Sequence, residues 1–161
     1  MRAAALLVLP VAFFIFGLAA GMFVNQLQQS REEFALSTPT AEGLLPADRI
    51  SSDAIKVYAN HVDIEIPNAQ WASFSPTGSM LPVLGPTAHA LQIVPQSGDD
   101  IKVGDIISYH YNGKVISHRV IEKGADDQGT YFIAKGDNNP EPDPEPVRFS
   151  QIDRVVVAIV Y

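Results

Sequence analysis

From residue 55 to the end of the chain, apolar and polar residues tend to alternate, and they do not recur at the spacing of a helix. This alternation is typical of strands that bury one face and expose the other. It predicts eight half-buried strands, at residues 55–58, 61–66, 71–74, 90–94, 106–111, 115–121, 131–134 and 155–161. Pro, Gly, Asn and Asp separate them. We therefore expect a mainly β, antiparallel domain over residues 55–161.

Two local signals refine this pattern. Asn112 and Gly113 both tolerate a positive φ, which a type I′ turn requires at its two central residues, so they predict a hairpin between the flanking strands. The short segment after Ser150 is the only part of the domain with a helical pattern, and Ser150 is a candidate N-cap.

A different pattern precedes the domain. Residues 3–24 include no charged side chain, and 22 helical residues span about 33 Å, close to the roughly 30 Å hydrocarbon core of a bilayer. We predict a transmembrane anchor at residues 1–24. The alternative is a cleaved signal peptide, but the apolar run is long for one and no A-x-A pair ends it. The polar, proline-containing residues 25–54 are expected to form a linker or stalk.

Charge suggests an orientation for this anchor. Arg2 precedes it, whereas Arg31 follows at a distance beside Glu32. The positive-inside rule then places the N-terminus in the cytoplasm. We expect a single-pass protein of the cell membrane with its β domain on the extracytoplasmic side.

Composition excludes several classes of function. The 161 residues are 47% hydrophobic, enough for about one folded domain and an appendage. A formal charge of −7, without a Lys/Arg cluster, argues against nucleic acid as a partner. The chain has no cysteine, and therefore no disulfide, thiolate metal site or thiol nucleophile.

Candidate chemistry centres on Ser79, within the run Thr-Gly-Ser-Met-Leu-Pro at residues 77–82. Gly78 permits unusual backbone angles and Pro82 restricts Leu81 to extended geometry, so the hydroxyl is expected at the end of a strand. A structural turn is the competing interpretation, and a catalytic serine needs a base.

His118 is our candidate base. Strand alternation places it on one face with Ile116 and Val120, and we expect that face to be buried. The competing interpretation is a core histidine that bonds a backbone carbonyl. The other histidines lie near predicted strand edges or in loops, where we expect them to be solvated: His61, His89 and His110.

Residues 135–144 are too rich in proline and turn formers for a helix or a central strand. A carboxylate from this loop is a candidate partner for the second ring nitrogen of His118. The loop also imitates the start of a calcium-binding EF-hand, but Pro142 and Arg148 occupy its glycine and glutamate positions, so we expect no metal.

With Ser79, His118 and this loop in that order, the chain resembles the type I signal peptidases, in the archaeal and endoplasmic-reticulum branch that uses histidine as its base. The resemblance runs from about residue 71 to the C-terminus. The segments that carry it are residues 77–82, 104–107, 117–121 and 135–139, together with Asp143. Each segment alone is weak, but four in the same order are specific.

The resemblance implies a β-rich peptidase that removes signal peptides from exported precursor proteins without a cofactor. It assigns Ser79 as nucleophile, His118 as general base and Asp143 as the acid of the triad. Asp137 matches a second acidic position that supports the site, and we rank Asp143 above it. Thr77 falls where relatives carry a hydroxyl that helps the Ser79 N–H form an oxyanion hole.

Residues 71–75 lead into Ser79 and are candidates to pair with an extended substrate. We expect Phe74, Ser75 and Gly78 to contribute to substrate binding. The chain departs from its relatives at Leu81, where they often have glutamate, and in residues 83–89, which replace a short Gly-Asp segment. These departures affect substrate preference more than the reaction. Leu81, Val83 and Leu84 are candidates either for contact with the lipid membrane or for ordinary core packing.

Three other functions stay open. A related serine peptidase with a different membrane-tethered substrate has the same motifs. An anchored β-rich binding module is a second possibility, in which Ser79 and His118 are only structural. The third is a Ser-Lys peptidase or self-cleaving repressor, but Lys114 and Lys123 flank His118 without taking its place.

Overall fold

The computed structural model describes residues 45–161. These belong to a compact unit, Ala41–Tyr161, so the predicted boundary at residue 55 falls inside it. The predicted anchor at 1–24 and most of the predicted stalk lie outside the described residues. Within the described part of the chain, no helix is long and apolar enough to cross a membrane.

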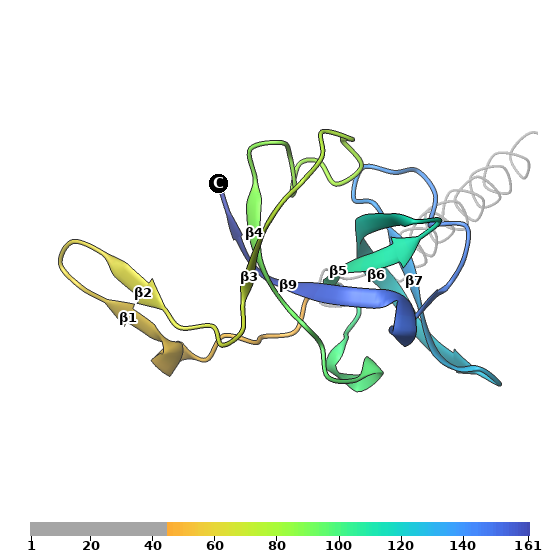
Figure 1. The fold of residues 1–161 in the computed structure, drawn as a ribbon, viewed down its shortest axis with the longest axis horizontal. Coiled ribbons are helices and arrows are strands. Elements are labelled where there is room, and N and C mark those ends of the chain that lie inside the picture. Colours follow the sequence, from red (N-terminus) through yellow and green to blue (C-terminus); the bar gives the residue numbers. More distant parts are fainter. Residues whose placement is uncertain (1–44) are drawn as a thin grey trace, which may run out of the picture. The chain divides into compact units, whose positions relative to one another are not determined.

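Seven strands form one antiparallel sheet in the order β3-β4-β9-β5-β6-β7-β8 (Figure 1). Their bounds are β3 Gln70–Ser73, β4 His89–Ile93, β5 Ile106–Tyr111, β6 Lys114–Asp126, β7 Gly129–Lys135, β8 Val147–Arg148 and β9 Ile152–Val160. The prediction of a mainly β, antiparallel domain is confirmed. The sequence pattern missed the two-residue strand β8, which is too short to show alternation.

The β5–β6 hairpin forms as predicted. Tyr111 pairs with Lys114 across the turn, and the two residues between them have positive φ, 49° at Asn112 and 73° at Gly113. The backbone therefore has the handedness of a primed hairpin turn. This hairpin carries His118 on β6, so its register helps to position the candidate base.

The first two predicted strands differ from expectation. β1 (Ile55–Val57) and β2 (Val62–Ile64) form their own two-stranded sheet, and every residue in them is exposed. The prediction that they are half-buried is wrong. Opposite partners lie on one face, so the sequence does produce an apolar face of Ile55, Val57, Val62 and Ile64. Alternation defines such a face but does not determine what packs against it.

The helix predicted after Ser150 is also wrong. Ser150 lies inside a single 3₁₀ turn, Phe149–Gln151, and the chain then enters β9 at Ile152. The β-branched residues that follow pair with β4 on one side and β5 on the other, so β9 is an interior strand. Sheet pairing on both sides outweighs the local helical pattern.

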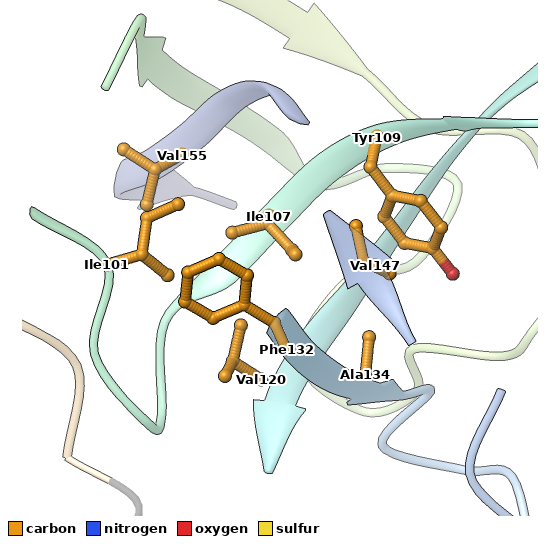
Figure 2. Packing of buried hydrophobic residues seen from close by; sticks show 8 residues of the cluster. All are labelled: Ile101, Ile107, Tyr109, Val120, Phe132, Ala134, Val147 and Val155. Atoms are coloured by element: carbon orange, nitrogen blue, oxygen red, sulfur yellow. The ribbon is translucent and has the colours of Figure 1, made fainter. Parts of the chain in front are cut away.

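Two groups of buried side chains form the core. One group packs between β5, β6, β7 and β9 (Figure 2) and comprises Ile101, Ile107, Tyr109, Val120, Phe132, Ala134, Val147 and Val155. Figure 2 shows the Tyr109 ring at one end of this group, with its hydroxyl directed away from Ile101 and Val155. The other group brings Met80 and Leu84, next to Ser79 in sequence, against the sheet residues Ala90, Ile106 and Val156.

Part of the predicted stalk is attached to this sheet. The Ala47 N–H donates to Asp105 Oδ1, and the Arg49 guanidinium donates to both Asp105 oxygens at 2.7 and 2.8 Å. Asp105 is fully buried. Burial raises the pKa of Asp105, but the bonds from Arg49, Lys102 and Ala47 lower it further, and the net result is a pKa below the usual range. Residues 47–49 therefore pack as part of the domain.

Candidate active site

Ser79 lies in the turn that follows β3, and two features hold its backbone. Gly78 has a φ of +77°, which favours glycine there. The Asn138 N–H donates to the Ser79 carbonyl at 2.8 Å, and the Asn138 side-chain amide donates to the Gly78 carbonyl at 3.1 Å. The loop at residues 135–144, which we call the acidic loop, thus fixes the backbone position of Ser79.

His118 meets Ser79 through its ring. Its side chain lies on the buried face of β6, as alternation predicted, and the residue is 7% exposed. The Nε2 atom lies 3.2 Å from Ser79 Oγ. The face is shared with Val120, which is fully buried, and Ile116, which is half-buried.

Asp143 holds the other side of this ring. His118 Nδ1 lies 2.9 Å from Asp143 Oδ1 and 2.8 Å from Oδ2. Because an ionised carboxylate can only accept, the Nδ1 atom carries the proton in this contact. Nε2 is then left to accept the hydroxyl proton of Ser79. The Asp143 N–H donates to the Ala134 carbonyl at 2.8 Å, which ties the carboxylate to β7.

A tyrosine extends this series of contacts beyond Asp143. The Tyr109 hydroxyl donates to Asp143 Oδ2 at 2.5 Å, and Tyr109 is 2% exposed. Burial, followed by the hydrogen bond to the Asp143 carboxylate, raises the pKa of the Tyr109 phenol well above its usual range. Tyr109 is therefore a permanent hydrogen-bond donor.

Sequence reasoning missed Tyr109. The available signal was its place in β5 on the same face as the buried Ile107, since a buried tyrosine hydroxyl usually has a partner.

Asp137 has a different partner. Arg119 donates to both of its oxygens, from Nε and Nη2, at 2.7 Å each. The remaining Arg119 Nη1 donates to the Gly104 carbonyl at 2.7 Å. This two-pronged ion pair links the start of the acidic loop to β6 and to the segment before β5. Asp137 thus lies beside the row of Ser79, His118 and Asp143 without taking part in it.

The loop approaches Ser79 closely enough to exclude a side chain at Gly136. A Cβ there would lie 2.6 Å from the Ser79 carbonyl oxygen and 2.7 Å from the Asn139 side-chain amide. Only glycine leaves room for this approach. Each residue of the Gly-Asp-Asn run at 136–138 therefore has a structural reason. Gly136 leaves space for the Ser79 carbonyl, Asp137 pairs with Arg119, and Asn138 makes two hydrogen bonds to the turn that carries Ser79.

Thr77, the predicted oxyanion residue, lies beside Ser79. Its Oγ1 is 3.3 Å from Ser79 Oγ. Among the hydrogen bonds of the described residues, none uses the Ser79 backbone N–H. That N–H is therefore free to donate to an oxygen that develops charge near the serine.

Ser79 and His118 line a cleft of about 690 Å³. The predicted substrate residues Phe74 and Ser75 also line it. Gly78 is not among the lining residues, and its positive φ shapes the turn that carries Ser79.

The remaining histidines lie elsewhere: His61 and His110 are exposed, and His89 is half-buried against Trp71 with ring centroids 4.7 Å apart.

Near Ser79, the residues at which the chain differs from the signal peptidases that it resembles lie partly in the core and partly at the surface. Leu84 is buried in the second core group, with Val83 packed against it, so both serve core packing. Leu81 is 42% exposed.

Comparisons with known proteins give little beyond this geometry. No protein-family model matches the chain, and no solved structure matches it. A protein of Methanocaldococcus jannaschii, described as uncharacterized, is 50% identical over 46 residues. That match spans 29% of this chain and 23% of the relative.

Proposed function

We propose that this protein is a membrane-anchored serine endopeptidase of the signal-peptidase type, which cleaves N-terminal signal peptides from exported precursors. The observation that carries the proposal is a series of two contacts: Ser79 Oγ lies 3.2 Å from His118 Nε2, and His118 Nδ1 lies 2.8 Å from Asp143 Oδ2. We call these three residues the catalytic row. A binding module has no need of a serine, a histidine and an aspartate in this order and orientation.

The first chemical step follows from these contacts. Nε2 of His118 accepts the proton of Ser79 as the oxygen attacks the scissile carbonyl, and Asp143 stabilises the imidazolium that forms. The tetrahedral intermediate collapses when His118 passes that proton to the leaving amine. The peptide C-terminal to the bond departs, and an ester to Ser79 remains.

Water then hydrolyses the ester. His118, neutral again, removes a proton from water as the water attacks, and returns that proton to Ser79 as the acyl group leaves. Charge on the tetrahedral oxygen is stabilised by the free Ser79 N–H, with the Thr77 hydroxyl as a second donor. No cofactor or metal enters this sequence.

Substrate binding is proposed at β3. This strand ends the seven-stranded order, so one of its edges has no strand partner in that sheet. Its residues Ala72 and Ser73 line the cleft, followed by Phe74 and Ser75. An extended peptide that paired with this edge would run towards Ser79.

The cellular context is part of the proposal. It rests on the charge-free residues 3–24 and on the chemistry of the substrates, which are secretory precursors in a lipid membrane. We place the peptidase domain on the extracytoplasmic side, and expect no nucleic acid partner.

Cleavage of a membrane-inserted precursor with an A-x-A site tests the proposal. We expect the full chain to cut after the second alanine, and Ser79→Ala and His118→Ala to lose nearly all activity. His110→Ala and Ser150→Ala are matched controls at exposed positions and are expected to keep the parent rate. Lys114→Ala, which alters another residue of the cleft, distinguishes a histidine base from a lysine base.

Two outcomes would contradict the proposal. Equal behaviour of the parent, Ser79→Ala and His118→Ala would remove the catalytic assignment and favour an anchored binding module. Loss of activity in Lys114→Ala with activity retained in His118→Ala would replace the histidine by the lysine as base.

A further inference from the structure

One part of the cleft lining, which we call its floor, consists of three polar side chains. Gln92 on β4 and Ser108 on β5 are only 4% and 3% exposed, yet both line the cleft, as does Ser117 on β6. Protein interiors seldom hold such a group unless its members bond one another or a ligand. The proposed catalytic steps use none of the three.

These side chains form a continuous row of hydrogen bonds. The Gln92 Nε2 amide donates to Ser108 Oγ at 2.8 Å, and Ser108 Oγ lies 2.8 Å from Ser117 Oγ. Ser108 and Ser117 are opposite partners in the β5–β6 register, so their side chains lie on one face of the sheet. The members of the row come from β4, β5 and β6, with β9 lying between β4 and β5 in the sheet, and Ser117 is the last member.

Ser117 is equipped to bond a further group. Since either serine can donate in the bond between them, the Ser117 hydroxyl can offer the cleft a proton or a lone pair. The donation from Gln92 to Ser108 also polarises the row, which strengthens the donor at its end. A partner that can both donate and accept fits this site best.

The rest of the cleft limits what this partner is. Met80 and Leu84 contribute apolar walls near Ser79. Lys114 and Asp153 line the same cleft with opposite charges, so the pair supplies no net charge to select an ionised side chain. A neutral hydroxyl satisfies both the polar floor and the apolar walls.

We propose that Gln92, Ser108 and Ser117 form a specificity subsite that selects substrates with a serine or threonine side chain near the scissile bond. This inference rests on the proposed peptidase function. A larger substrate side chain without a hydroxyl covers the Ser117 hydroxyl and returns no hydrogen bond, which carries an energetic cost. An alanine is small enough to leave the Ser117 hydroxyl accessible to solvent.

Threonine and valine provide the sharpest comparison, because they have nearly the same shape and differ in one hydroxyl. Precursors that carry Ala, Thr or Val at each position on the N-terminal side of the scissile bond in turn are compared by kcat/KM. We expect one position at which the parent cleaves the Thr precursor about 10- to 100-fold faster than the Val precursor. Elsewhere the two are expected to be nearly equal.

Two variants test whether the polar residues of the floor cause this preference. In Ser117→Ala and Gln92→Leu, the Thr/Val ratio at that position is expected to fall to about unity, while cleavage of the Ala precursor persists. Persistence shows that the variants fold and that the catalytic row is intact. Ser52→Ala and Gln128→Leu change exposed residues of the same types and are expected to preserve the ratio.

The outcomes separate the two claims. Absence of Ser79-dependent cleavage for every precursor overturns the proposed function. Cleavage with no Thr/Val preference at any position overturns the subsite alone. So does a preference that Ser117→Ala and Gln92→Leu leave unchanged.

Discussion

The two ends of the acidic loop each carry an aspartate, and the two aspartates have opposite kinds of partner. At its start, Asp137 is bound by the Arg119 guanidinium, which stays charged at any working pH. At its end, Asp143 contacts Nδ1 of the His118 ring, whose Nε2 faces the Ser79 hydroxyl, and accepts a hydrogen bond from the Tyr109 hydroxyl. In the proposed mechanism, the first end holds the loop in place and the second end takes part in proton transfer.

The comparison shows that proximity in sequence does not decide a carboxylate's role. Asp137 and Asp143 are six residues apart in one loop, and both are shielded to a similar degree, with side chains 16% and 13% exposed. What distinguishes them is the partner: Asp137 binds an arginine that ties the loop to β6, whereas Asp143 binds a histidine ring that also contacts the Ser79 hydroxyl. Three substitutions test this distinction, each in a single residue.

Asp143→Asn is expected to have the largest effect on the reaction. The amide can present N–H groups to Nδ1 and so favour the wrong tautomer of His118, and we expect kcat to fall by about 10⁴-fold with the fold retained. Cleavage kinetics of an A-x-A precursor measure kcat, and circular dichroism checks the fold. A loss of less than about tenfold would mean that Asp143 does not orient the base.

Asp137→Asn is expected to act mainly on stability. It leaves the Arg119 guanidinium, 18% exposed, without its carboxylate, and we expect a loss of about 2 kcal/mol in the free energy of unfolding. Through the loop that holds Ser79, kcat is expected to fall by roughly 10- to 100-fold, far less than in Asp143→Asn. Urea unfolding followed by Trp71 fluorescence provides the free energy.

Asp126→Asn is a useful control for that measurement, because it also breaks a two-pronged pair with an arginine, Arg148, at a more exposed place. If Asp137→Asn left stability unchanged but cost more in kcat than Asp143→Asn, the two roles would have to be exchanged.

Tyr109→Phe is expected to have the smallest effect, and it probes the proton-transfer end alone. Without the phenol, the Asp143 charge is less shielded and holds the protonated form of His118 more strongly. The acid limb of the kcat/KM profile should therefore move to higher pH, with less than about a tenfold loss at the optimum. A merely structural tyrosine would lower the whole profile without moving this limb.

The strand pattern predicted most of the fold because a half-buried strand leaves its period in the sequence. Residues 106–111 form β5 with the predicted bounds, and the hairpin at Asn112 and Gly113 follows from backbone preferences of those two residues. The failures occur where local pattern and tertiary context disagree. Nothing in residues 55–64 reveals that their apolar face stays exposed, and nothing after Ser150 reveals two neighbouring strands.

The candidate site divides in the same way. Alternation placed His118 on the buried face of β6. Glycine and proline around Ser79 predicted constrained backbone at the end of a strand, whereas Ser79 lies in a turn beyond the end of β3. The choice between Asp143 and Asp137 was only a ranking, since a loop of prolines has no period from which to infer direction. Tyr109 and the Gln92–Ser108–Ser117 row depend on register between strands distant in sequence. No local pattern encodes that register.

Covalent labelling of the serine tests the central claim most directly, because it needs no knowledge of the substrate. The full chain is treated with a fluorophosphonate, and the modified residue is located by peptide mass spectrometry. We predict a single modification at Ser79, abolished in His118→Ala and strongly slowed in Asp143→Asn, with Asp137→Asn closer to the parent. Labelling at another serine, or labelling of Ser79 at the same rate without His118, would contradict the proposed catalytic row.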